Sequence, residues 1–155
     1  MKYNIYAIGN MRRSPEAEIF LKYSKRIKNI EFFEYVSNFD EKNKKINDES
    51  KKLLSMIKNN GKKILLDEKG KILSSFEFSK LISDWRNHGH NILNFLIGGA
   101  DGVNENISEN VDLTISLSNM TFPHMLARIV LVEQIYRSET CLLYTSPSPR
   151  DLSTS

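Results

Sequence analysis

Cysteine, proline and long apolar runs are scarce in this chain of 155 residues. It holds one Cys, which excludes an intrachain disulfide framework and a cysteine-rich zinc site. No apolar run approaches the roughly 18 residues that a membrane-spanning helix needs. Two tyrosines and Asn4 interrupt the apolar start that a signal peptide would require. We therefore expect a cytoplasmic domain of a reducing compartment, with no membrane partner.

Two common phosphate-binding motifs and a plausible metal-ligand set are also missing. No G-x-G-x-x-G follows the first apolar segment, and no G-x-x-x-x-G-K-[ST] occurs, which argues against a generic nucleotide-binding domain. His88 and His90 flank a glycine and have no third ligand nearby in the sequence. We therefore predict no metal site.

The composition is that of a folded domain with an uneven charge. Hydrophobic residues make up 40% and aromatic residues 10%, which excludes a wholly disordered chain. Residues 1–60 hold 13 basic and 8 acidic side chains, whereas residues 61–140 hold 8 and 10. A basic first half suits an anionic partner such as RNA, but charge alone favours the simpler interpretation of a solvated lysine-rich face.

Short apolar segments alternate with segments of helical periodicity. The apolar segments predict strands over 3–8, 30–36, 63–66, 92–97 and 112–117. Lys69-Gly70 is typical of a turn, and Ser74 with Glu77 has the spacing of a helix-capping box. The periodic segments predict helices over 15–28, 41–59, 75–87 and 123–137, with a weak helix over 104–109.

Alternation of this kind predicts the α/β class, with a mostly parallel sheet of five to six strands and helices on both faces. Ligands of such sheets bind at the carboxyl ends of the strands, which here are Leu66-Asp67, Gly98-Gly99 and Leu117-Ser118. The last predicted helix is apolar around much of its circumference. Such a helix either packs against a second subunit or is simply buried in the core.

Residues 141–155, CLLYTSPSPRDLSTS, differ from the rest of the chain. Six of these fifteen are Ser or Thr and two are Pro, and no strand or helix period continues into them. The segment resembles a translated sequencing adapter. We therefore predict one domain over 1–140 and a non-native, disordered tail over 141–155; the alternative is a genuine Ser/Pro-rich tail.

Three ordered motifs carry a family resemblance over residues 1–137: L-I-G-G-A-D-G (96–102), L-S-N-M-T-F-P-H (117–124) and R-I-V-L-V-E-Q-I-Y-R (128–137). Together with A-I-G (7–9) and L-D-x-x-G (66–70), they resemble the RlmH family of ribosomal RNA pseudouridine methyltransferases, which is of the SPOUT class. The resemblance implies a C-terminal trefoil knot, an exception to the usual absence of knots, and a homodimer.

The resemblance also implies S-adenosylmethionine as cofactor. By match to the family motifs, its contacts would come from the ends of the third and fourth predicted strands and from the segment that follows the last strand. These residues are Leu66, Gly98, Leu117, Ser118, Asn119, Met120, Thr121 and Phe122. Apolar side chains and loop backbone in this pattern suit an adenine ring better than charged groups would.

The implied reaction is methylation of N3 of a pseudouridine in helix 69 of 23S rRNA, with the assembled 70S ribosome as substrate. The N3 proton must leave, so we consider His124, Arg128 and Arg137 as catalytic residues that orient the base or stabilise its anion. A helix N-terminus would lower the pKa of His124. The structural alternatives are a helix cap for His124 and surface ion pairs for the arginines.

One departure from the family bears on activity. Family members continue after the Tyr-Arg pair into a His-Pro-Tyr-His-like element, which is absent after Tyr136-Arg137 here. We therefore expect normal cofactor binding and reduced turnover. The alternatives are a SPOUT methyltransferase that acts on tRNA or another rRNA base, and a non-catalytic homologue that binds the ribosome.

Overall fold

A computed structural model describes residues 1–143, with side chains described through Thr140. Its centre is one sheet in which five strands, all parallel, lie in the order β2-β1-β4-β3-β5. This confirms the predicted α/β class and parallel sheet. The strands are β1 (Lys2–Ile8), β2 (Ile30–Tyr35), β3 (Lys62–Ile72), β4 (Ile92–Ile97) and β5 (Leu113–Ser116).

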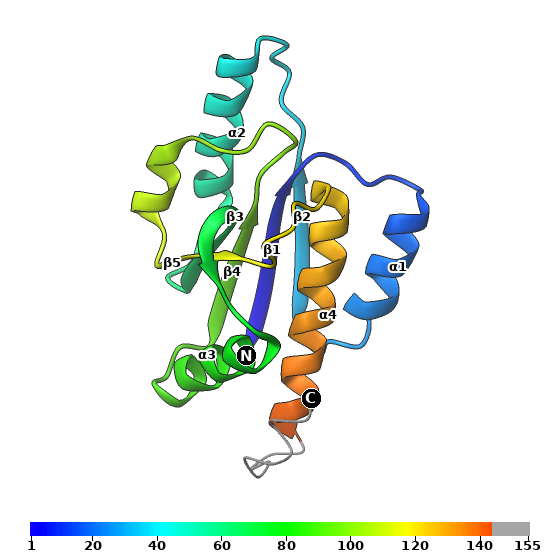
Figure 1. Cartoon of the computed structure of the whole chain (residues 1–155), viewed down its shortest axis with the longest axis vertical. Coiled ribbons are helices and arrows are strands. Elements are labelled where there is room, and N and C mark those ends of the chain that lie inside the picture. Colours follow the sequence, from blue (N-terminus) through cyan, green and yellow to red (C-terminus); the bar gives the residue numbers. More distant parts are fainter. Residues whose placement is uncertain (144–155) are drawn as a thin grey trace.

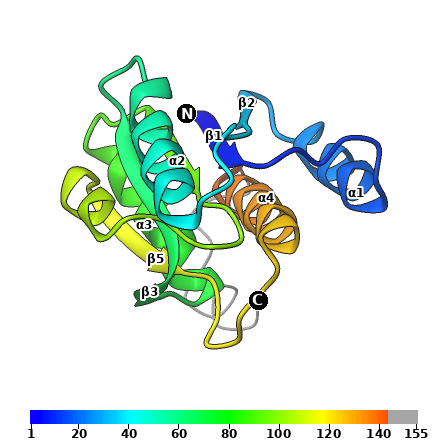
Figure 2. The same ribbon diagram turned by 90° about the horizontal axis from the view of Figure 1, so that it is seen from above.

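Helices cover both faces of the sheet (Figures 1 and 2). On one face, the last helix packs between the first and the third; on the other, the second helix and a short 3-10 helix lie together. No helix within residues 1–143 combines the length and the apolar character needed to cross a bilayer. The helices are α1 (Pro15–Ser24), α2 (Lys42–Met56), α3 (Ser75–Asn87), η1 (Glu105–Asn110) and α4 (His124–Leu143).

The two faces of the sheet carry separate apolar cores. Along β1, Ile5 and Ala7 join the core beneath α1, α3 and α4, whereas Tyr6 and Ile8 join the core beneath α2 and η1. This is the alternation of a strand that is buried on both faces, and it explains why β1 is apolar almost throughout. The fold therefore depends on β1, β4 and β3, the three inner strands, each of which contributes to both cores.

Capping residues define the helix starts as the sequence indicates. Ser74 and Glu77 form the predicted capping box: the Ser74 hydroxyl accepts from the Glu77 amide at 3.0 Å and Glu77 accepts from the Ser74 amide at 2.9 Å. Ser14 caps α1 with its side chain alone, which accepts from the Ala17 amide at 3.1 Å. The ends are less well predicted, because α1 ends at Ser24 rather than residue 28 and α2 at Met56 rather than residue 59.

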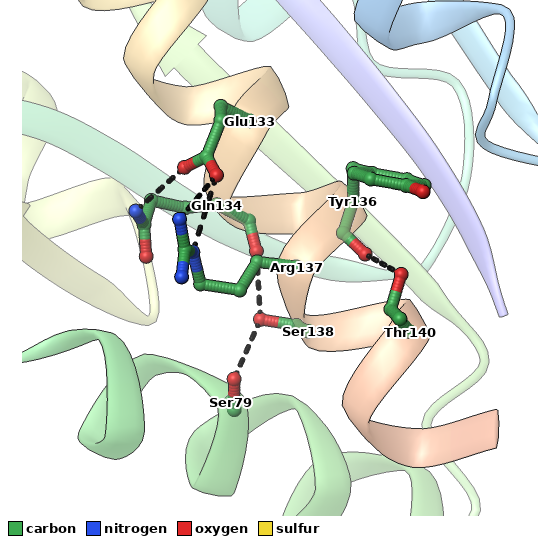
Figure 3. A network of polar contacts seen from close by, with 7 residues as sticks. All are labelled: Ser79, Glu133, Gln134, Tyr136, Arg137, Ser138 and Thr140. Carbon is green, nitrogen blue, oxygen red and sulfur yellow. Dashed lines mark hydrogen bonds and ion pairs between the residues drawn. The ribbon is translucent and has the colours of Figure 1, made fainter. Parts of the chain in front are cut away.

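Helix α4 runs to Leu143, beyond the predicted end at residue 137. Its last turns are held by polar contacts that hydrophobic periodicity does not reveal (Figure 3). The buried Ser138 hydroxyl lies 2.9 Å from that of Ser79 on α3, and Glu139 accepts hydrogen bonds from Tyr3 and Arg86. The first three residues of the predicted tail, 141–143, thus belong to α4, and the remainder, 144–155, lies outside the described residues.

Strand β3 does not turn at Lys69-Gly70 as predicted. It bulges over residues 67–70 and then resumes pairing with β5, so that both Leu66 and Lys71 oppose Ile115. The bulge is compact because the Asp67 carboxylate accepts from the Lys69 amide at 2.9 Å. At Gly70, a Cβ atom would lie 2.7 Å from the backbone of Ile115, so only glycine lets β5 approach this closely.

Gly70→Ala should therefore destabilise the fold by about 1–3 kcal/mol, because the added methyl group forces β3 and β5 apart. Chemical denaturation followed by circular dichroism measures this. Lys69→Ala, at an exposed position in the same bulge, is the matched control and should stay within about 0.5 kcal/mol. Equal effects of the two substitutions would mean that the close approach at Gly70 is not restrictive.

Candidate functional site

A cavity of about 420 Å³ opens at the carboxyl ends of β4 and β5, beside the bulge of β3, at the edge where parallel sheets bind ligands. Three segments line it: the bulge of β3 (67–70), the glycine-rich loop after β4 (98–103) and the segment between β5 and α4 (117–123). Its volume falls within the range of roughly 300–1,000 Å³ that is usual for small-molecule sites. The lining residues are 66–69, 97–103, 116–118, 120–122, His124 and Ala127.

The structure brings together nearly all the residues that the family resemblance suggests for the cofactor. Asn119 alone among them does not line the cavity, and Met120 is 75% exposed at its rim. The lining residues from this set are Leu66, Gly98, Leu117, Ser118, Met120, Thr121 and Phe122. They come from the middle of β3 and from the ends of β4 and β5, which are distant in the sequence, so no single motif defines the site.

Local hydrogen bonds shape the segment between β5 and α4. The Ser116 hydroxyl donates to the Ser118 carbonyl at 2.8 Å, and the Ser118 hydroxyl accepts from the Met120 amide at 2.9 Å. Thr121 then donates to Glu68 on the β3 bulge at 3.2 Å. The small polar residues therefore fold the loop back on itself and tie it to the opposite wall.

Helix α2 contacts the glycine-rich loop after β4 and supports it. The Gly102 amide donates to the Gly99 carbonyl at 3.0 Å, and the Asn104 amide donates to the Ser50 hydroxyl at 2.9 Å. The Glu49 carboxyl is only 2% exposed and packs against Gly99. Sequence analysis missed Glu49, although its place four residues before buried Leu53 marks it as facing inward.

Three acidic side chains and one basic side chain line the cavity: Asp67, Glu68, Asp101 and Lys69. The excess of negative charge favours a ligand that carries positive charge over one that carries phosphates. Within the described residues, no three His, Cys, Asp or Glu side chains are grouped so as to hold a metal ion.

His124, at the start of α4, lines the cavity as the sequence suggests. Its pKa lies below the usual value, because burial disfavours the imidazolium and the positive charge of Arg128 adds to the effect. The direction agrees with the expectation, but the cause is burial and a neighbouring cation. The ring is thus a neutral imidazole near neutral pH.

Arg128 is inside the protein rather than at the cavity surface. Its side chain is 0% exposed, and it donates to Glu34 at 2.6 Å and to the Ile8 carbonyl at 2.7 Å. It also lies over the Phe32 ring, 5.3 Å from its centroid. A guanidinium bound in this way cannot contact a substrate directly, so any role in orienting one passes through its neighbours.

Arg137 is not brought to the cavity of its own chain. Its side chain is 48% exposed and pairs with Glu133 one turn earlier on α4, at 2.7 Å (Figure 3). Of the three residues suggested for catalysis, the structure therefore places only His124 at the cavity.

Comparison with known proteins gives one family and many relatives. The family model described as "Predicted SPOUT methyltransferase" matches residues 1–144. A protein of Fusobacterium nucleatum named "Ribosomal RNA large subunit methyltransferase H" is 38% identical over 144 residues, which covers 88% of this chain and 92% of its own length. A protein of the same name from Paramagnetospirillum magneticum is 35% identical, with 92% and 95% covered.

A solved structure has a similar fold. It is that of a Legionella pneumophila protein "in complex with the bound cofactor SAM", and it matches with a TM-score of 0.51 and 12% identity. The match covers 90% of this chain and 66% of the other. At this identity the likeness is one of fold.

Burial raises the pKa of Glu49; Lys45 opposes the shift, and Asp101 and Asp48 add to it. The folded state therefore holds the proton more tightly than the unfolded chain, whose ordinary value is 4.5. Below pH 4.5 the Glu49 carboxyl is protonated in both the folded and the unfolded state, so it costs the fold no stability. As the pH rises through the folded-state pKa, the buried group ionises and stability falls.

Glu49→Gln should therefore raise the melting temperature at about pH 7.5, and the gain should disappear near pH 4. Differential scanning calorimetry at the two pH values checks this. Glu109→Gln, at an exposed position, is the control and should change neither. A gain of the same size at both pH values would show that ionisation of Glu49 costs no stability.

Proposed function

The chain belongs to the SPOUT methyltransferase family, and from this premise we propose that it transfers a methyl group from S-adenosylmethionine to large-subunit ribosomal RNA. The relatives that carry the name "Ribosomal RNA large subunit methyltransferase H" span nearly the whole chain and support this substrate. The observation that carries the proposal is the cavity in which the β3 bulge, the glycine-rich loop and the segment after β5 converge.

The residues of this cavity fit S-adenosylmethionine. Leu66, Leu117 and Phe122 supply apolar walls for an adenine ring. Gly98 lines the cavity with backbone atoms, and a Cβ atom there would lie 2.6 Å from the Val103 side chain. The acidic side chains at Asp67, Glu68 and Asp101 suit the positive charges of the amino group and the sulfonium. When bound, the cofactor supplies an electrophilic methyl group on a good leaving group, so alignment by the protein accounts for much of the catalysis.

For the position of the methyl group, we propose N3 of a pseudouridine in the loop of helix 69 of 23S rRNA, in the assembled 70S ribosome and hence in the cytoplasm. The family resemblance supports this choice. A base in a hairpin loop can be unstacked at modest cost and presented to a cavity of this kind. The basic residues of positions 1–60, and exposed Arg137, supply cations for phosphate contacts.

We further propose a homodimer, a knotted C-terminal region, and one catalytic domain over 1–140 followed by a non-native segment over 141–155, of which 141–143 continue α4. Exposed apolar side chains on α1 and α4 support the dimer: Ile19 is 44% exposed, Leu21 52% and Leu126 44%. The return of the chain from β5, at one edge of the sheet, to α4 beneath the end of β1 is compatible with the knot.

The first test is methyl transfer to 70S ribosomes that lack the modification. With radiolabelled S-adenosylmethionine, we expect label in 23S rRNA, and mass spectrometry of the digested helix 69 should locate it at N3. A second chain that ends in the His-Pro-Tyr-His element should turn over faster with unchanged cofactor affinity.

Other outcomes would overturn the proposal. Label in tRNA or at another rRNA base would assign the chain to a different substrate. Saturable cofactor or ribosome binding with no transfer, even by the chain with the family tail, would identify a non-catalytic homologue.

Ser118→Ala should weaken S-adenosylmethionine binding by about three- to tenfold, because the loop loses a hydrogen bond worth roughly 1 kcal/mol. Isothermal titration calorimetry measures the Kd. Ser108→Ala is the matched control, since it removes a hydroxyl that donates to Glu105 in η1, outside the cavity lining. An unchanged Kd for Ser118→Ala would mean that this loop does not hold the cofactor.

A further inference from the structure

The side chains of Arg128 and His124 both lie close to Gly9, which follows the last residue of β1. Gly9 has a φ of +105°, and a Cβ atom there would lie 3.3 Å from the Arg128 guanidinium and 3.5 Å from a ring nitrogen of His124. The two side chains are one turn apart on α4. The bare glycine therefore lets Arg128 and His124 lie side by side against the backbone of β1.

Arg128 is fixed in this position by partners on two strands. Glu34 on β2 accepts from Arg128 and, with the same oxygen, from the Met11 amide at 2.9 Å, while Ile8 on β1 accepts from the other nitrogen of the guanidinium. The guanidinium is fully buried, and its Nε has no hydrogen-bond partner in the described residues. Because the guanidinium is buried and held in one position, its positive charge is weakly screened and interacts strongly with neighbouring titratable groups.

Among the residues that line the cavity, His124 is the one whose imidazole interacts with the positive charge of Arg128. Neither ring nitrogen makes a hydrogen bond within residues 1–140, so the ring is available to a ligand. Arg128 is the charge that shifts its pKa, in the same direction as burial. The other charged groups that face this region are Glu34 on β2, the cavity residues Asp67, Glu68 and Lys69 on β3, and Asp101 after β4.

We propose that Arg128 is a positioning residue that keeps His124 a neutral imidazole at the cavity, and that His124 accepts the N3 proton of the target base. The second half rests on the proposed function. The N3 proton passes to a ring nitrogen of His124, and the electron pair left on N3 forms the new bond to the methyl carbon. The pair of the broken carbon–sulfur bond stays on sulfur, and the imidazolium then loses its proton to water.

The role of Arg128 is tested without turnover, by NMR titration of the histidine rings in the full chain, with His124→Asn to assign the resonance. Glu34→Gln keeps the acceptor oxygen but removes its negative charge, so the pKa of His124 should fall. Glu34→Gln/Arg128→Gln removes both charges, so it should rise. Arg128→Lys keeps the cation, so the pKa should stay low.

A merely structural role would not move the pKa in opposite directions. An unchanged pKa in the double variant would overturn the coupling. Should that variant fail to fold, an unchanged or raised pKa in Glu34→Gln would do the same. His90→Asn, which removes an exposed histidine outside the cavity lining, is the control for folding and for the titration.

The role of His124 is tested on ribosomes. His124→Asn should lower kcat at least about 100-fold and leave the Kd for S-adenosylmethionine within about threefold. The midpoint of the rising limb of the kcat/KM–pH profile, which reports groups of the free enzyme, should follow the NMR pKa through the Arg128 and Glu34 series. Retained kcat in His124→Asn, or a midpoint that does not follow, would overturn the assignment.

Failure of the two proposals can be told apart. If both the unaltered chain and the chain with the family tail bind S-adenosylmethionine but methylate no RNA, the proposed function fails, and the assignment of His124 as proton acceptor fails with it. The titration still decides whether Arg128 holds His124 neutral.

Discussion

The buried guanidinium of Arg128 is the interaction on which the site depends. It joins α4 to the ends of β1 and β2, and so fixes the helix from which His124 projects. Removing such a charge from water costs several kcal/mol, and the cost is offset only when its partners are well placed. Desolvation lowers the pKa of Arg128, and the hydrogen bond and charge of Glu34 raise it again. A buried ion pair is weak evidence of a gain in stability, but it specifies one position for α4.

The charge of the protein is divided between two tasks. Basic side chains predominate in the first 60 residues, whereas the cavity is lined by more acids than bases. A surface that attracts phosphates and a cavity that prefers a cation can operate together only if they do not overlap. In this chain the separation follows from topology, because the lining comes from segments that begin at Leu66.

Much of the fold follows from local pattern, and the departures have physical causes. The five strands and the capping box of α3 were predictable because their signals lie within a few consecutive residues. The bulge of β3 was not, since it depends on β5, which follows more than forty residues later. The length of α4 depends on Tyr3 and Arg86, which bind Glu139 from distant elements.

The site divides in the same way. The family motifs supplied the loops of the cavity, but spacing alone could not show that Arg128 is buried or that Glu49 packs against Gly99. Periodicity indicates which positions of a helix face inward. A charged residue at an inward position can be identified as buried only when the group that pairs with its charge is known. Glu34 and Ile8 lie 94 and 120 positions from Arg128.

Those separations also bear on how the protein is made. The parallel pairing of β1 with β4 joins residues about ninety positions apart, and Arg128 reaches back still further to β1. Contacts between residues so far apart in the sequence form slowly, because the chain loses the entropy of closing a long loop before the contact stabilises it. A growing polypeptide can assemble β1, β2 and their helices early, but the cavity has no wall after β5 until α4 has been synthesised and has docked. The cavity therefore takes its shape only after α4 has docked.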